Sequence, residues 1–270
     1  MFQRVLPLIV LLSLLVVGCN GPFQKKMVKI AVSVPLNLEV SQDMLNGIEL
    51  ALSEAGGQAG DVFVEIELFD SSEPNGTTLS PELELEAANK AIADEVVVAF
   101  ISGAWTDQTR ATLPLLNKEG LSQVSLMATW PGLTRPGFAV QEPEIYYPGA
   151  ERHFFRMVPT DVEQSTAAAE WAFQLGYRTI FVIDDGSTYG NGAAELFEKR
   201  ATELGMNIVN RIALETAGPL PEEESRLLAD RRQALEVDLL YFSGALAFDF
   251  VYSIRAIMPS VPVMVSDGLV

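Results

Sequence analysis

The stretch that decides the fold reads VKIAVSV (28–34), then QDMLNGIELALSEAGG (42–57), then VFVEIELF (62–69). The first and third runs are short and apolar, which is typical of buried strands. In the middle run apolar residues recur at helical spacing, and a glycine pair predicts where the helix ends. We expect Ser41 to cap this helix. A strand, a helix and a second strand in this order indicate a parallel unit.

The alternation of strands and helices continues to the end of the chain. Further strands are predicted at 96–101, 123–126, 154–158, 179–184, 206–212, 239–243 and 261–265. Further helices are predicted at 80–94, 106–118, 161–175, 191–204, 224–235 and 247–257. Asp161 and Gln164 have the spacing of a capping box. The fold class is therefore α/β: two doubly wound, Rossmann-like lobes with parallel sheets, at 28–158 and 159–270.

The first residues predict an export signal. Arg4 precedes an apolar run at 5–17, which is short for a spanning helix of about 20 residues and typical of a secretory signal peptide. The run ends at Gly18-Cys19, and Cys19 is the single cysteine of the chain. These residues resemble a bacterial lipobox, which implies a signal peptide at 1–18, a lipid on Cys19 and a linker to residue 27. The alternative is a buried cysteine in an uncleaved helix.

The composition argues against several classes of function. A net charge of −18 does not suit nucleic acid, because phosphate binding needs clustered Lys and Arg. One histidine, His153, leaves almost no material for a metal site or a Ser-His-Asp triad, and we expect it to be structural or solvated. The spacing of Gly186, Gly190 and Gly192 does not match a dinucleotide-binding loop. We therefore expect no catalysis, cofactor or metal.

In open parallel sheets, ligands bind beyond the carboxyl ends of the strands. The loops predicted there place Thr106 at a helix N-terminus, which favours a carboxylate. The loop of Met127 and Thr129 offers backbone carbonyls and a hydroxyl. Tyr189 can cover a ligand, and Asp267 can pair with an ammonium group. The alternatives are plain helix capping for Thr106 and a turn role for Asp267.

Five motifs in this order resemble one known family, the type I periplasmic binding proteins of the branched-chain amino-acid uptake group. The motifs are QDMLNGIELA (42–51), the helix end at 113–120 followed by TWPGLT (129–134), FRMVPTD (155–161), the loop 185–190, and SDG (266–268). The resemblance covers residue 28 to the end of the chain.

The resemblance implies an extracytoplasmic protein that captures an amino acid or similar solute by lobe closure. Its partners would be the permease of an ABC importer and the membrane, reached through the lipid on Cys19. By position, Thr106 matches a hydroxyl that binds the ligand carboxylate, and Met127 and Thr129 match further contacts. Tyr189 matches an aromatic lid, and Asp267 matches the acidic residue that pairs with the ammonium.

The chain also departs from the leucine-binding members. Val40 and Ala245 stand where those members have aromatic residues, which puts leucine itself in doubt. The loop 140–152 is longer, and we expect Tyr146 and Tyr147 to reach the cleft edge. Segments 20–26, 142–149 and 217–223 look like linkers.

Two further expectations concern the length of the chain and its class. Family members cross back to the first lobe after the Asp-Gly motif, so we expect the second part of that lobe to be missing. The alternatives to a transport protein are a signalling receptor of the same fold and a Rossmann-like enzyme.

Overall fold

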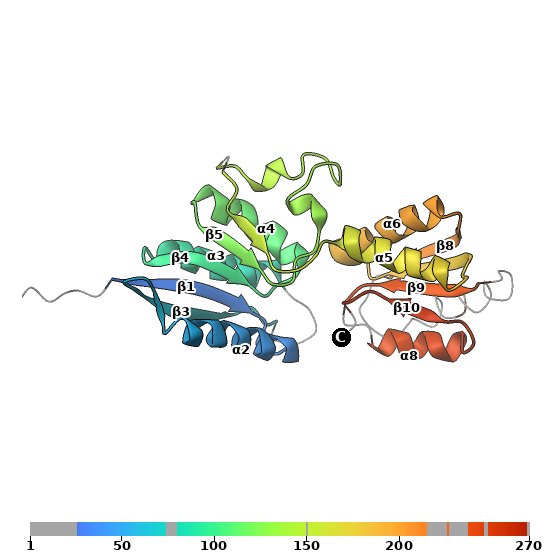
Figure 1. Cartoon of the computed structure of the whole chain (residues 1–270), viewed down its shortest axis with the longest axis horizontal. Coiled ribbons are helices and arrows are strands. Elements are labelled where there is room, and N and C mark those ends of the chain that lie inside the picture. The colour runs from blue at the N-terminus through green and yellow to red at the C-terminus, as the bar shows by residue number, and fades with distance from the viewer. Residues whose placement is uncertain are drawn as a thin grey trace, which may run out of the picture.

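The computed structural model describes residues 26–73, 80–149, 151–214, 226, 237–245 and 248–268. Within these residues the chain forms two α/β lobes that lie side by side (Figure 1). The expected signal peptide, Cys19 and the segment 217–223 lie outside the described residues, as does the predicted helix 224–235 apart from Arg226.

The first lobe contains a six-stranded sheet in the order β2-β3-β1-β4-β5-β6. All neighbouring strands are parallel except the short β2, which pairs antiparallel with β3. The strands are β1 (Met27–Val34), β2 (Gln58–Ala59), β3 (Val62–Asp70), β4 (Val97–Ser102), β5 (Ser122–Ser125) and β6 (Phe154–Arg156).

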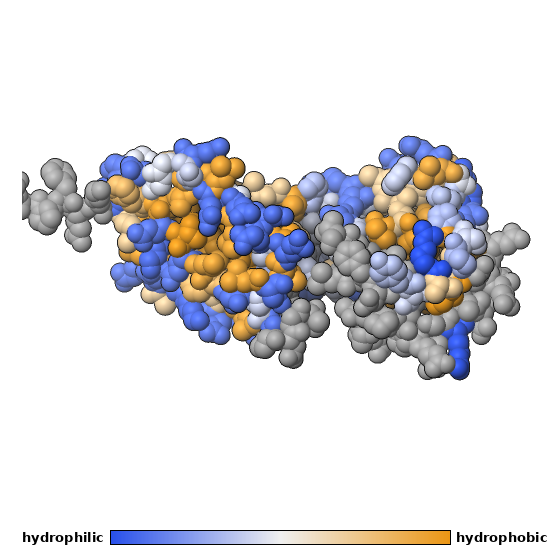
Figure 2. Space-filling view, turned by 90° about the horizontal axis from the view of Figure 1, so that it is seen from below, coloured by the Kyte–Doolittle hydropathy of each residue, from blue (hydrophilic) through white to orange (hydrophobic). Residues whose placement is uncertain are grey.

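Two helices, α3 (Pro81–Ala93) and α4 (Thr106–Lys118), pack on one face of this sheet. Ala31 and Phe100 of the sheet are fully buried there against alanines of α3 and Leu116 of α4. α2 (Glu39–Glu54) lies on the opposite face (Figure 1). On that face Leu68 and Phe155 remain 45% and 58% exposed, and Figure 2 shows apolar surface over this lobe.

The second lobe has a four-stranded parallel sheet in the order β10-β9-β7-β8. Its strands are β7 (Thr179–Asp184), β8 (Asn207–Ala213), β9 (Leu239–Ser243) and β10 (Val263–Val265). α5 (Asp161–Gln174) and α6 (Thr188–Glu203) cover one face, where Phe197 stacks on Tyr241. α8 (Phe248–Ile257) covers the other through Ile254. The predicted class, α/β with two doubly wound lobes, is confirmed.

Three helix starts differ from the sequence prediction. α2 begins at Glu39, and Ser41 is not its cap because its hydroxyl donates to the carbonyl of Pro35 at 2.7 Å. The capping box of α5 is formed by Thr160 and Glu163, one residue before the predicted pair. α6 begins at Thr188, where Ser187 caps the helix by accepting from the backbone N–H of Gly190 at 2.9 Å.

The segment 142–149 is part of the core, so its interpretation as a linker is wrong. It includes a short 3-10 turn, Glu144–Tyr146, and a second such turn covers Pro131–Leu133. Tyr146 and Tyr147 are buried with Trp130 and Leu133 rather than presented at the cleft edge. The buried Glu142 holds this cluster together by accepting hydrogen bonds from Trp130 and Tyr146, because a buried carboxylate needs donors.

Candidate functional site

The carboxyl ends of the strands in both lobes lie at the junction between the lobes (Figure 1). α4 of the first lobe and α6 of the second meet there through Thr188. Its backbone N–H donates to Asp107 at 3.4 Å, and its hydroxyl accepts from Arg110 at 3.0 Å. Gly192 of α6 also approaches Trp130 so closely that a Cβ would lie 2.4 Å from the indole ring. The described lobes are therefore in direct contact beside the predicted site.

Thr106 is the first residue of α4 and does not cap it. The N-cap position is Trp105, which makes no side-chain cap hydrogen bond. Thr106 is 1% exposed, and its hydroxyl has no hydrogen-bond partner in the part of the chain that the structure describes. A buried hydroxyl beside uncapped helical N–H groups is a favourable arrangement for an anion. The capping role is thus wrong, and the ligand role of Thr106 stays a prediction.

Thr129 lies in the loop that follows β5 in the first lobe. Its backbone carbonyl accepts from the N–H of Asp161 at 3.1 Å, while its hydroxyl has no hydrogen-bond partner among the described residues. Met127 is half-buried in the same loop. The loop also stays close to β4, since the N–H of Leu126 donates to the carbonyl of Ser102 at 2.9 Å.

Tyr189 and Asp267 are brought together by the second lobe. The phenolic hydroxyl of Tyr189 donates to Asp267 at 2.6 Å and accepts from the N–H of Gly268 at 3.2 Å. Burial and the charge of Asp267 raise the pKa of Tyr189. Asp267 is therefore bound to the predicted lid residue and is more than a turn former.

Asp161 joins this group, although the sequence suggested only a capping role for it. It is 1% exposed, and neither carboxylate oxygen has a hydrogen bond of ordinary geometry within the described segments. Burial raises the pKa of Asp161 to about 7; Thr129 and Arg156 oppose the rise, and Asp267 adds to it. In the sequence, only the position of Asp161 in the inter-lobe motif 155–161 points to a role at the site.

The candidate site has more hydrogen-bond acceptors than donors where four side chains come together: Thr129, Asp161, Tyr189 and Asp267. Arg156 is the positive side chain that acts on Asp161, but its guanidinium donates to the carbonyl of Trp130 and the hydroxyl of Thr134. A buried carboxylate in a medium of low polarity is stabilised by a cation. This end of the site is therefore suited to an ammonium group.

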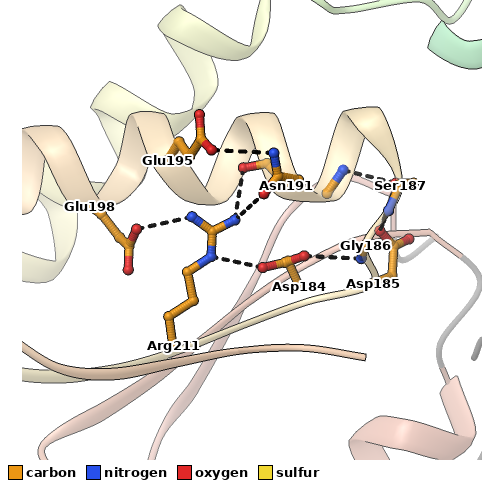
Figure 3. Close-up of polar contacts among 9 residues, drawn as sticks. Asp184, Asp185, Gly186, Ser187, Asn191, Glu195, Glu198 and Arg211 are labelled. Carbon is orange, nitrogen blue, oxygen red and sulfur yellow. Dashed lines mark hydrogen bonds and ion pairs between the residues drawn. The ribbon is translucent and has the colours of Figure 1, made fainter. Parts of the chain in front are cut away.

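A polar network holds the start of α6, the helix whose first turn contains Tyr189 (Figure 3). Arg211 of β8 donates to Asp184 at 2.8 Å, to Glu198 at 3.1 Å and to the side chain of Asn191 at 2.6 Å. Asp184 accepts in turn from the N–H of Gly186 at 2.9 Å. Because both carboxylates contact one guanidinium, the network fixes β7, β8 and α6 relative to one another.

Asp185 extends this network toward β9. It accepts from the hydroxyl of Ser187 at 2.6 Å and from the N–H of Ala245 at 2.9 Å. A Cβ on Gly190 would lie 2.1 Å from the carboxylate of Asp185. This glycine thus allows the first turn of α6 to pack closely against Asp185.

The described residues offer neither a metal site nor a helix that could span a membrane. Across the described ranges, no three His, Cys, Asp or Glu side chains gather in a way that would hold a metal ion. The Nε2 atom of His153 lies 3.6 Å from a carboxylate oxygen of Glu151, whose side chain is exposed. None of the helices that the structure describes has the length and apolarity to span a bilayer.

Comparison with known proteins identifies the family and the fold of the chain. A family model described as periplasmic binding protein matches residues 28–245. The chain belongs to the periplasmic binding protein family. Its fold is the type I fold that the motifs predicted, and the family is one of extracytoplasmic binding proteins, not of enzymes.

Solved structures with the same fold include a leucine-binding protein from Thermotoga maritima, at 21% identity and a TM-score of 0.72. The chain aligns over 89% of its own length with 63% of that protein. A solute-binding protein of an ABC transporter from Rhodopseudomonas palustris, in complex with p-hydroxybenzoic acid, gives 18% identity and a TM-score of 0.72, covering 89% of this chain and 61% of that one.

A curated relative is "Glutamate receptor 2.7" of Arabidopsis thaliana, 23% identical over 246 residues, which are 89% of this chain and 23% of the relative. The chain thus spans less than two thirds of the length of the proteins it resembles.

Replacing Asp161 by Asn is expected to stabilise the protein above neutral pH. Since the folded-state pKa of Asp161 is raised to about 7, the folded state keeps a proton that the unfolded state loses at lower pH. Stability is therefore lost as pH rises through 7. At pH 8 Asp161→Asn should raise the free energy of unfolding by roughly 1–3 kcal/mol, and by much less at pH 5.

Urea denaturation at both pH values measures this, with the exposed Asp43→Asn as the control. An Asp161→Asn variant that is equally destabilised at pH 5 and pH 8 would contradict the account.

Proposed function

We propose that this protein is an extracytoplasmic substrate-binding lipoprotein that captures an amino-acid-like solute between lobes 28–158 and 159–270. Its partner would be the permease of an ABC importer. The observation that carries the proposal is Asp161, a buried carboxylate whose oxygens have no ordinary hydrogen bond in the described chain and which lies beside Asp267 and Tyr189. Such an arrangement binds a ligand that brings its own positive charge.

In this proposal the ammonium group of the ligand lies against Asp161 and Asp267. The hydroxyl of Thr129 supplies a third polar contact. Tyr189, already bound to Asp267 at 2.6 Å, covers the ligand from the second lobe. An ammonium held by two carboxylates and a hydroxyl has an acceptor for each of its three N–H groups.

The carboxylate of the ligand lies at the start of α4. The buried hydroxyl of Thr106 and the first N–H groups of the helix are its donors, and the partial positive charge of the helix N-terminus adds to the attraction. Met127 contributes through the backbone of the neighbouring loop. Because the resemblance puts Val40 and Ala245 where leucine-binding members have aromatic residues, the side chain of the ligand need not be that of leucine.

Lobe closure would involve contacts already present between α4 and α6. Arg110 bonds Thr188 at 3.0 Å and the Tyr146 hydroxyl at 2.7 Å, and its guanidinium lies 3.4 Å from Glu142. The first-lobe partners Tyr146 and Glu142 are buried and fix the guanidinium, so Arg110 presents Nη1 to Thr188 of the second lobe in one orientation. A ligand that bridges the lobes adds to this contact and favours the closed form.

A second candidate role is ligand sensing rather than uptake. The similarity to a plant glutamate receptor favours it, and the same cleft would serve both. Transport of the bound ligand by a reconstituted permease distinguishes the two roles, because a sensor would not deliver its ligand to a permease.

A thermal-shift screen tests the ligand class. We expect free amino acids to raise the melting temperature, because binding at a hundredfold excess over Kd stabilises by about 2.7 kcal/mol. The panel contains L-leucine, L-phenylalanine, their carboxamides, the corresponding amines and 4-hydroxybenzoate. Asp267→Asn should weaken amino-acid binding roughly tenfold to a hundredfold, while the exposed Asp61→Asn should not.

Stabilisation only by ligands that lack an ammonium group, such as 4-hydroxybenzoate, would overturn the roles of Asp161 and Asp267. In that case the aromatic-acid binders would be the better guide to function.

The anchor is tested by Cys19→Ser. The native protein should fractionate with membranes, and its N-terminal peptide should carry lipid on Cys19 by mass spectrometry. The variant should be released from the membrane and keep the same ligand affinity, since Cys19 lies before the matched region. A membrane-bound variant would show that the lipid is not the anchor.

A further inference from the structure

Glu84 is a buried acid that the ligand contacts do not use. It lies on α3, is 0% exposed, and faces the carboxyl ends of β1 and β4. Among the residues with described side chains, no Lys or Arg forms an ion pair with it. Burying a carboxylate without a cation costs free energy, and an apolar side chain of the same size would fill the space more favourably. Its presence therefore calls for an explanation in terms of function.

Two serine hydroxyls from different strands donate to this carboxylate. Ser33 of β1 donates to Oε2 at 2.5 Å, and Ser102, the last residue of β4, donates to Oε1 at 2.7 Å. Burial raises the pKa of Glu84, and the hydroxyls of Ser102, Ser33 and Ser71 oppose the rise. One carboxylate thus links three separate elements: α3, β1 and β4.

The orientation of Ser102 also affects the loop that precedes α4. Because its hydroxyl proton points to Glu84, its oxygen is free to accept, and it accepts from the N–H of Ala104 at 3.3 Å. The N–H of Gly103 donates to the carbonyl of Ser33 at 2.8 Å. A Cβ on Gly103 would lie 2.6 Å from Val34. Residues 102–104 are therefore bound tightly to β1, directly before Thr106.

We propose that Glu84 is the positioning residue for the carboxylate end of the ligand. By holding Ser33 and Ser102 it sets where the loop 102–105 enters α4, and so where Thr106 and the first helical N–H groups lie. Anion recognition by N–H groups depends on their fixed direction. The role rests on the proposed function, since it concerns the same cleft.

The test compares Glu84→Ala and Glu84→Gln with the control Glu86→Ala, which lies on the same helix but has a 60% exposed side chain. The first readout is hydrogen exchange of the amides of residues 103–106 without ligand, with the loop 186–190 as internal reference. The second is the affinity for L-phenylalanine relative to L-phenylalaninamide, measured by calorimetry.

We expect Glu84→Ala to speed exchange in 103–106 at least about tenfold and to leave 186–190 unchanged. The preference for the acid over the amide should fall about tenfold, since only the acid uses this loop. Glu84→Gln, which keeps one acceptor for a serine, should recover part of both effects. Glu86→Ala should show neither.

A Glu84→Ala variant that exchanges evenly throughout the lobe, or weakens acid and amide binding equally, would overturn the proposal, because Glu84 would then be a general stabilising residue. If the native protein binds neither compound nor any other amino acid, the proposed function fails. The exchange readout still decides whether Glu84 positions the loop.

Discussion

Asp161 connects the two lobes and is the residue on which the proposed ligand site depends. Its backbone N–H donates to the carbonyl of Thr129 in the first lobe, and Asp161 is the first residue of α5 in the second lobe. Its carboxylate is buried at this crossing, which raises its pKa to about 7. Burying the ionised carboxylate without a cation costs free energy. A ligand that brings an ammonium group removes this cost, so the site selects for ligands with a positive charge.

The loops around this carboxylate are fixed by separate polar networks in each lobe. In the first, Glu84 binds the serines at the ends of β1 and β4. In the second, Arg211 joins Asp184 of β7 to Glu198 of α6 (Figure 3) and so supports the helix that begins beside Tyr189. The side chains of both networks are ones that the proposed ligand contacts do not use. Preorganised loops lose little conformational entropy on binding.

Much of the fold could be predicted from the sequence, because apolar strands and amphipathic helices alternate with clear periodicity. The loops of Thr106, Thr129, Tyr189 and Asp267 followed from the carboxyl-end rule. The sequence predicts only a capping role for Asp161 and no role for Glu84, because the burial of a polar residue in a helix depends on tertiary contacts. The interpretation of 142–149 as a linker fails for the same reason, because its two prolines, its glycine and its charges do not reveal that Glu142 is buried among hydrogen-bond donors.

Proton release on ligand binding tests the central claim most directly. Calorimetry of L-phenylalanine binding in two buffers of different ionisation enthalpy gives the number of protons released. If an ammonium group pairs with Asp161, about half a proton should leave at pH 7 and more at pH 6, and Asp161→Asn should abolish the release. Binding without any release of protons between pH 6 and pH 7 would contradict the account.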